Sequence, residues 1–94
     1  MAIRLVVSFK AQAGKGAEMA QAFLPMTKET QKEPGCEQYE IFRSADDPDK
    51  LVLLERWTDQ AALDAHMVVL RERGPMPTAG LGDGRPARER YEAE

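Results

Sequence analysis

The sequence predicts an α+β domain whose four strands and two helices follow the order β-α-β-β-α-β. Three observations support this prediction. Apolar side chains alternate with polar ones in short segments, they recur every three or four residues in two longer segments, and Gly or Pro residues lie between most segments. The chain has 94 residues, a length that suits one domain over residues 1–94 with one hydrophobic core.

The first part of the chain predicts a strand followed by a helix. Residues 3–10 are rich in β-branched and aromatic side chains, and glycines soon follow them. Residues 17–32 have apolar side chains at helical spacing, and the helix stops at Pro34-Gly35. We expect a kink at Pro25, because proline lacks the N–H group that a helix interior needs. The predicted buried stripe of this helix contains Met19, Phe23, Met26 and Thr30.

The middle of the chain predicts a hairpin of two strands. Residues 36–44 alternate in an incomplete period-two pattern. Residues 51–57 form an apolar run typical of a strand that is covered on both faces. The polar residues 46–49 supply the turn between the two strands.

The last part of the chain predicts a helix, a long loop and a closing strand. Thr58 or Asp59 can cap the helix, which ends at Gly74. Seven of the thirteen residues in 74–86 are Gly or Pro, a composition that resists packing and predicts an irregular surface loop. Residues 87–93 alternate with period two, as in a strand of modest hydrophobicity.

The composition excludes several classes of partner and site. Thirteen Lys and Arg against sixteen Asp and Glu give a net charge of −3, so we expect neither nucleic acid nor a membrane as a partner. No apolar stretch has the length of a membrane span. The single cysteine, Cys36, excludes an intrachain disulfide, and no set of Cys and His residues suits structural zinc. We therefore expect a reducing, cytoplasmic setting.

Three short motifs resemble those of a known family. They are Glu33-Pro34-Gly35-Cys36, Leu54-Glu55-Arg56-Trp57, and the run from Asp59 to His66 that reads D-Q-A-A-L-D-A-H. Together they resemble the antibiotic biosynthesis monooxygenase (ABM) domain, including its quinol monooxygenase-like members. The resemblance implies a ferredoxin-like sandwich that pairs through its antiparallel sheet into a dimeric α+β barrel, with a small apolar pocket between sheet and helices in each subunit.

The resemblance also implies an activity. ABM enzymes oxidise small electron-rich aromatics, such as quinols, anthrones or related polyketides, with dioxygen and without metal, flavin or nicotinamide. A base removes a phenolic or enolic proton from the substrate, and such help is typically worth about 10²–10⁴ in rate. We therefore expect no cofactor, dioxygen as co-substrate, a small aromatic substrate and a second copy of the chain as partners.

Two residues are the candidate catalytic groups. His66 is the only histidine, and its side chain is the one here whose ordinary pKa, about 6.5, suits proton transfer near neutrality. Its structural alternative is a helix-face histidine that hydrogen-bonds a backbone carbonyl. Trp57 is expected both to fill the core and, as the resemblance implies, to pack against the substrate ring.

Further residues are expected to bind the substrate. Alternation places Leu53, Glu55 and Trp57 on one face of the strand predicted over residues 51–57. The resemblance implies that this face lines the pocket. Glu55 would be costly there as an unpaired ion, so it either pairs with a cation such as Arg4 or Arg56 or has a raised pKa. The full candidate set for substrate binding is Leu53, Glu55, Phe9, Tyr39, Phe23 and Met67, and Tyr91 is a further possible hydrogen-bond donor.

One departure from the family pattern keeps other functions open. Anthrone-oxidising members carry Asn at the position that aligns with Leu53, and leucine cannot make that hydrogen bond. Haem-degrading members have Asn at the position of Phe9 and a haem-ligating His near the position of Met76. This chain has neither residue, so we do not expect haem degradation. The alternatives are a non-catalytic small-molecule-binding or stress-response barrel, and an isomerase that uses the same pocket.

Overall fold

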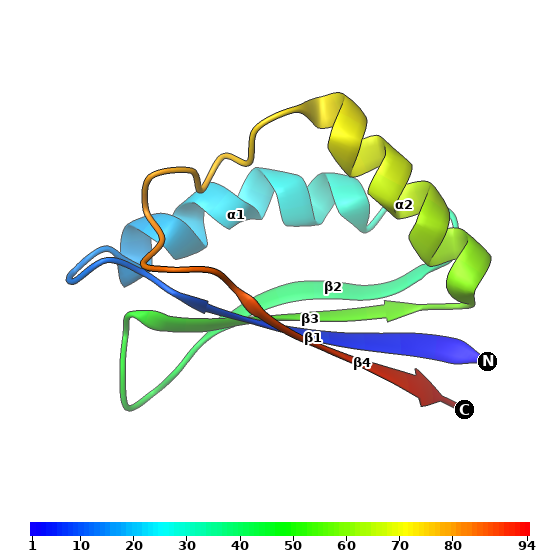
Figure 1. Ribbon diagram of the computed structural model, residues 1–94, viewed down its shortest axis with the longest axis horizontal. Coiled ribbons are helices and arrows are strands. Elements are labelled where there is room, and N and C mark those ends of the chain that lie inside the picture. Colours follow the sequence, from blue (N-terminus) through cyan, green and yellow to red (C-terminus); the bar gives the residue numbers. More distant parts are fainter.

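The structure is a computed structural model that describes residues 1–94. Its four strands form one antiparallel sheet in the order β2-β3-β1-β4, and both helices lie on the same face of that sheet (Figure 1). The elements are β1 (Ala2–Lys10), α1 (Gly16–Thr30), β2 (Cys36–Arg43), β3 (Lys50–Trp57), α2 (Gln60–Arg73) and β4 (Ala87–Ala93). The predicted α+β class and the β-α-β-β-α-β order of a ferredoxin-like sandwich are thus confirmed.

The two faces of the sheet differ as the period-two pattern requires. In β3, Leu51, Leu53, Glu55 and Trp57 are buried under the helices, and the residues between them are only partly covered. Glu55 lies opposite Leu5 of β1 on one side and Tyr39 of β2 on the other. The predicted alternation of β3 is therefore correct, and it places a carboxyl group near the middle of the buried face. The prediction that this strand is covered on both faces is wrong for the chain by itself, because only the inner face is buried.

Helix α1 begins at Gly16 and is anchored by the loop between β2 and β3. The side chain of Asp49 accepts hydrogen bonds from the backbone N–H groups of Gly14 and Gly16, at 3.0 and 2.9 Å. These contacts hold the pKa of Asp49 below its usual value. A Cβ at Gly16 would lie 1.8 Å from the carbonyl oxygen of Pro48, so only glycine fits there. The helix continues through Pro25 without a break.

The predicted stripe of α1 and one side of α2 form the core with the sheet. Met19, Phe23, Met26 and Thr30 of α1 are all buried, as expected. Asp59, rather than Thr58, caps α2, since its carboxylate accepts from the backbone N–H of Ala62 at 2.8 Å. Only Leu63 and His66 of α2 are fully buried. Neither helix is long and apolar enough to cross a membrane.

The loop of residues 74–86 is irregular, as predicted, but it is packed more closely than its composition suggests. Thr78 is buried, and Leu81 is partly buried against the core. The backbone of the loop pairs with the end of β1, because Gln12 N donates to Leu81 O and Asp83 N donates to Lys10 O. These bonds fix the loop beside the turn that precedes α1.

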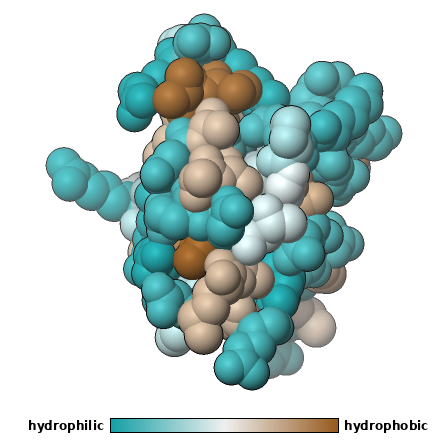
Figure 2. Space-filling model, turned by 90° about the vertical axis from the view of Figure 1, so that its right-hand side faces the viewer, coloured by the Kyte–Doolittle hydropathy of each residue, from teal (hydrophilic) through white to brown (hydrophobic).

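The outer face of the sheet has no helix over it (Figure 1). Its centre is apolar, with Val6, Val52 and Leu54 partly buried by neighbouring side chains. Phe42 is 46% exposed and Tyr91 is 51% exposed on the same face. The end of the molecule near the termini differs, since polar side chains cover most of it and hydrophobic ones form small separate patches (Figure 2).

Candidate active site

A pocket of about 290 Å³ opens between the inner face of the sheet and α2. Its lining combines apolar walls with a few polar groups, a pattern typical of small-molecule sites. Six of the residues that the sequence predicted for the site line it: Phe9, Tyr39, Leu53, Glu55, His66 and Met67. The remaining lining residues are Val7, Leu70, Met76, Pro86 and Arg88, so the loop before β4 contributes to the wall.

Two predicted site residues do not line this pocket. Phe23 is fully buried in the core, where its ring packs edge-on against Phe9 with 5.0 Å between centroids. Trp57 is also fully buried, and it lies behind His66 with 4.6 Å between the ring centroids. Their faces were predicted correctly, but each ring packs behind a residue that lines the pocket, Phe23 behind Phe9 and Trp57 behind His66. Tyr91 lies on the outer face of the sheet and is excluded from the site.

His66 is held on three sides by side chains. It is 1% exposed, and its ring packs against Trp57 and edge-on against Tyr39. Its Nδ1 atom lies 2.9 Å from Oε1 of Glu33. The structural alternative of a bond to a backbone carbonyl is therefore wrong, because the partner is a carboxylate.

The second ring nitrogen of His66 is unsatisfied. Nε2 is the one buried side-chain nitrogen or oxygen atom in the chain without a hydrogen-bond partner. A buried polar atom without a partner costs about 1–3 kcal/mol. Such atoms are uncommon in folded proteins and often mark a place where a ligand or a reaction supplies the missing partner. Nε2 is thus the atom of this site that is best placed to exchange a proton.

Glu33 and Arg73 complete the surroundings of His66, and neither was identified from sequence. Oε2 of Glu33 accepts from Nη2 of Arg73 at 3.2 Å, and Nη1 of Arg73 donates to Oγ1 of Thr30 at 3.2 Å. Glu33 belongs to the E-P-G motif, which marked it as a family feature without a role. Its contact with His66 spans 33 residues of sequence, so no local pattern indicated it.

Glu55 is buried on the pocket wall with an indole as its hydrogen-bond donor. Its Oε1 accepts from Nε1 of Trp57 at 3.0 Å. Burial raises the pKa of Glu55, and the Trp57 hydrogen bond and nearby His66 and Arg88 offset part of that rise. The raised pKa confirms one of the two expectations for this carboxyl group.

The expected ion pair of Glu55 with Arg4 or Arg56 is wrong. Both arginines occupy outer-face positions, opposite each other in the β1–β3 register. Arg4 donates to Gln38, and Arg56 pairs with Glu37 at 3.0 Å. Residues on opposite faces of a sheet cannot pair through it, so the alternation of side chains excludes both partners.

Two further groups near the site are unsuited to exchange protons at neutral pH. Burial raises the pKa of Tyr39 far above its usual value, with the negative charge of Glu55 as a second cause. Burial and the nearby carboxylates of Glu33 and Glu55 raise the pKa of the Cys36 thiol to about 11. Arg88 supplies the one cation of the pocket lining, and its guanidinium lies 3.9 Å from the sulfur of Met67.

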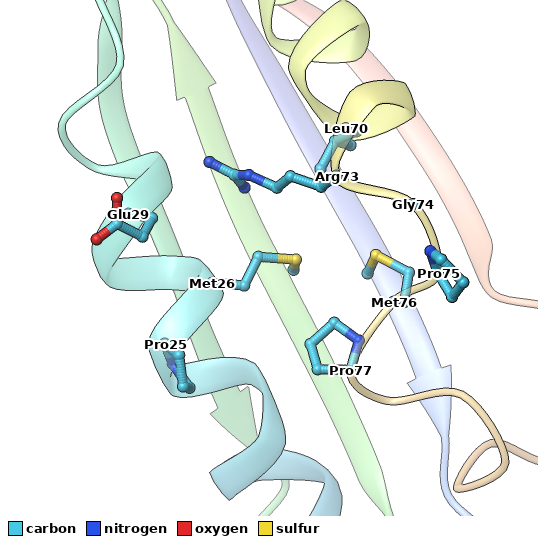
Figure 3. A pocket seen from close by; sticks show the side chains of 9 residues that line it. All are labelled: Pro25, Met26, Glu29, Leu70, Arg73, Gly74, Pro75, Met76 and Pro77. Atoms are coloured by element: carbon cyan, nitrogen blue, oxygen red, sulfur yellow. The ribbon is translucent and has the colours of Figure 1, made fainter.

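A second cavity of about 280 Å³ lies between α1, the end of α2 and the following loop. Figure 3 shows Met26 and Met76 directed toward each other across it, with Arg73 extending from α2 toward α1. Leu70 and Met76 line both cavities and separate them. Its polar side chains are Glu29 and Arg73, and Arg73 is already bound to Glu33. The pocket beside His66 is therefore the better candidate for chemistry.

No group of three or more His, Cys, Asp and Glu side chains is arranged to hold a metal ion.

Comparison with known proteins identifies the family. The family model described as antibiotic biosynthesis monooxygenase matches residues 2–68, more than two thirds of the chain. The chain belongs to this family. The matched range includes β1 to β3 and most of α2, and therefore Glu33, Glu55, Trp57 and His66. No curated protein matches the chain.

Solved structures agree with this assignment. A conserved protein from Methanosarcina mazei Go1 is 27% identical, with a TM-score of 0.86 over 100% of this chain and 94% of its own. A protein from Caulobacter crescentus CB15, named as a candidate antibiotic biosynthesis monooxygenase, is 27% identical, with a TM-score of 0.85 over 99% of this chain and 90% of its own. A protein from Shewanella oneidensis is 29% identical, with a TM-score of 0.78 over 96% of this chain and 88% of its own. The ABM-family fold therefore extends over the whole chain.

Proposed function

We propose that this protein is a cofactor-independent monooxygenase that oxidises a small electron-rich aromatic, such as a quinol, an anthrone or a related polyketide, with dioxygen. The observation that carries the proposal is the buried Nε2 of His66, which has no partner and belongs to a side chain on the wall of a mainly apolar pocket. Family membership supports oxygen chemistry in general.

The proposed reaction starts with proton transfer. A phenolic or enolic O–H of the substrate gives its proton to Nε2 of His66, and the remaining anion is electron-rich enough to pass one electron to dioxygen. Recombination of the two radicals forms a C–O bond and leaves a peroxide anion on that carbon, which takes back the proton from Nε2 of His66. The O–O bond of the hydroperoxide then breaks with loss of the hydrogen on the same carbon, so that water is released and one oxygen atom stays in the product as a carbonyl. The protein's part is to hold the substrate, accept the proton and exclude water, which strengthens electrostatic contacts inside the pocket.

The other pocket residues have supporting roles in this proposal. The rings of Phe9 and Tyr39 and the side chains of Leu53 and Met67 pack against the substrate ring. Trp57 acts indirectly, because its indole packs against His66 and donates to Glu55. At about 290 Å³ the pocket is just below the usual range for ligand sites, about 300–1,000 Å³, so the substrate is small.

Oxygen consumption tests this proposal. Purified protein is mixed with a panel of quinols and anthrones while dissolved oxygen is followed against the rate of autoxidation. We expect wild-type protein to accelerate uptake with at least one compound and His66→Ala to reduce that rate by roughly 10²–10⁴-fold. Leu24→Ala is the control, because Leu24 lies on α1 and does not line the pocket, and it should keep the rate. No acceleration by wild type, or an unchanged rate in His66→Ala, contradicts the proposal.

A second candidate is a non-catalytic module that binds a small molecule in the same pocket. Leu53 on the pocket wall offers no hydrogen bond to a substrate oxygen, and Nε2 of His66 is itself shielded from solvent. A compound that raises the unfolding temperature and is recovered unchanged under oxygen would favour this function. A compound converted equally well without oxygen would instead favour an isomerase.

We also propose that two copies associate through the outer face of the sheet to form the dimeric α+β barrel of the family. The helices leave this face uncovered, and its apolar centre suits burial against a second copy (Figure 1). A reducing, cytoplasmic location, consistent with the one free cysteine, completes the proposal.

A further inference from the structure

We propose that Glu33, held in place by Arg73, is a positioning residue that fixes His66 in the neutral tautomer with its proton on Nδ1. This tautomer leaves Nε2 without a hydrogen, as a proton acceptor directed away from Glu33. The use of Nε2 in catalysis rests on the proposed function, whereas the tautomer itself does not.

The turn before β2 positions the Glu33 side chain beside His66. Gly35 follows Glu33 in the Pro34-Gly35 turn and has a φ of 83°, which side chains other than glycine rarely adopt. A Cβ on Gly35 would lie 2.5 Å from the Cβ of Ala62, so the turn packs directly against α2. Ala62 precedes His66 by four residues and therefore lies one turn below it on the same helix face. The E-P-G turn thus places the Glu33 carboxylate beside the imidazole.

The charges around Glu33 decide which group carries the shared hydrogen. Oε2 of Glu33 accepts from the guanidinium of Arg73, which is always protonated. A carboxylate in that pair has no proton to donate. The 2.9 Å contact between Oε1 and Nδ1 is therefore a hydrogen bond that Nδ1 donates.

No other group competes to set the tautomer. Nε2 has no donor or acceptor within hydrogen-bond distance. The indole N–H of Trp57 already donates to Glu55, and Tyr39 contacts His66 through the edge of its ring. The other neutral tautomer would leave Nε2–H without an acceptor and would set the lone pair of Nδ1 against the Glu33 carboxylate, which is unfavourable. The Nδ1–H tautomer gives the one N–H of the imidazole an acceptor, the Glu33 carboxylate.

Arg73 has a part in this arrangement that its position on the surface of α2 does not suggest. Its guanidinium bridges Glu33 and Thr30 and so ties the end of α1 to the end of α2. Loss of Arg73 would leave the Glu33 carboxylate free to turn away from Nδ1. We therefore expect Arg73 to support the tautomer through Glu33 and to have no direct contact with substrate.

The catalytic consequence resembles that of other carboxylate–histidine pairs. A carboxylate on one ring nitrogen selects the tautomer, orients the ring and stabilises the positive charge that forms when the other nitrogen takes a proton. Removal of such a supporting carboxylate lowers the rate of the proton-transfer step more than it weakens substrate binding.

The tautomer of His66 can be measured by ¹⁵N NMR of its two ring nitrogens. With ¹⁵N-labelled protein, the two ring nitrogens of His66 are assigned without ambiguity, because the chain has no other histidine. Wild type is compared near neutral pH with Glu33→Met, which keeps much of the side-chain length but offers no carboxylate. Glu29→Met is the matched control, since Glu29 is an exposed carboxylate of α1 that contacts Lys32 and not His66. Arg73→Gln is paired with Arg71→Gln in the same way.

The expected result is a wild-type spectrum in which Nδ1 is protonated and Nε2 is not. Glu33→Met should give a mixture of tautomers, Arg73→Gln a smaller change in the same direction, and both controls the wild-type pattern. Where oxygen uptake is detected, Glu33→Met should lower kcat by roughly ten- to a hundredfold with little change in KM. A wild-type spectrum with the proton on Nε2, or an unchanged pattern in folded Glu33→Met, overturns the inference.

The wild-type spectrum alone tests the tautomer if Glu33→Met does not fold. Failure of the proposed function is distinguishable from failure of this inference. The Nδ1–H tautomer in a protein without oxygen uptake contradicts the monooxygenase and supports the role of Glu33. The opposite tautomer in an active enzyme overturns the role of Glu33 and leaves the monooxygenase in place.

Discussion

At the scale of single residues, His66 and Glu55 line the same pocket but are satisfied differently. His66 has a carboxylate on one nitrogen and nothing on the other. Glu55 has one neutral donor, the Trp57 indole, and no cation within ion-pair distance. Burial therefore favours the protonated form of Glu55, and the site combines an unpaired proton acceptor with a carboxyl group whose pKa is raised.

The raised pKa of Glu55 predicts how stability depends on pH. Glu55 keeps its proton to a higher pH in the folded protein than in the unfolded chain, where the pKa of its carboxyl group is near 4.5. Its stabilising contribution is complete below the unfolded pKa and is lost as pH rises through the folded pKa. Glu55→Gln keeps an acceptor for Trp57 Nε1 and cannot ionise. We expect it to match wild type in urea unfolding at about pH 4 and to be more stable at about pH 8.

Glu72→Gln is the control for this measurement, because Glu72 is exposed near the end of α2. Its difference from wild type should stay the same at both pH values. A Glu55→Gln variant that is less stable than wild type at the higher pH would show that Glu55 is ionised and paired in the folded protein.

At the scale of elements, the start of α1 depends on a loop that is distant in sequence. Asp49 replaces the missing side-chain cap of the helix, and Gly16 lets the backbone of Pro48 approach closely. The glycines at 14 and 16 read as a turn in the sequence, and the structure shows that Gly16 also carries the contact between α1 and the β2–β3 loop.

This contact predicts the effect of one added methyl group. Gly16→Ala would place a Cβ within 1.8 Å of the Pro48 oxygen, so the helix or the loop must move. We expect the free energy of unfolding to fall by about 1–3 kcal/mol. Gly82→Ala is the matched control, since its Cβ meets Met19 at an ordinary 3.5 Å, and it should change stability by less than about 0.5 kcal/mol. Equal stability of the two variants would contradict this account of Gly16.

The elements themselves were predicted well because their patterns are local. Composition located β1, an apolar run located β3, and alternation located β2 and β4. The Pro34-Gly35 and Gly74-Pro75 signals located the ends of both helices. The packing of residues 74–86 was missed, because the backbone bonds of Lys10 and Gln12 to that loop leave no trace in its composition.

The site was predicted only in part, because local sequence patterns do not report contacts between distant residues. Residues on the inner face of β3 follow from alternation, and His66 follows from its chemistry. Glu33 contacts His66 across 33 residues of sequence, and Arg73 contacts Glu33 across 40 residues, so no local pattern reports either contact. Phe23 and Trp57 were assigned to the correct faces, but their depth in the core depends on how the layers pack.

At the scale of the whole molecule, the uncovered outer face of the sheet predicts a dimer. In sedimentation the wild type should have about twice the 10.5 kDa mass of the chain. Phe42→Glu places a charge in this face, where the ring is 46% exposed, and should shift the protein to monomer. Val68→Glu is the control, because Val68 is 43% exposed on α2, and it should remain a dimer. A monomeric wild type would contradict the proposed assembly.

The central claim is that His66 starts the transfer of an oxygen atom from dioxygen to an aromatic substrate. Its most direct test is the isotopic composition of the product formed by wild type under ¹⁸O₂ in unlabelled water. We expect one ¹⁸O atom in each product molecule, formed at a rate that falls by roughly 10²–10⁴-fold in His66→Ala. A product without ¹⁸O, or the same rate of labelled product from His66→Ala, would contradict it.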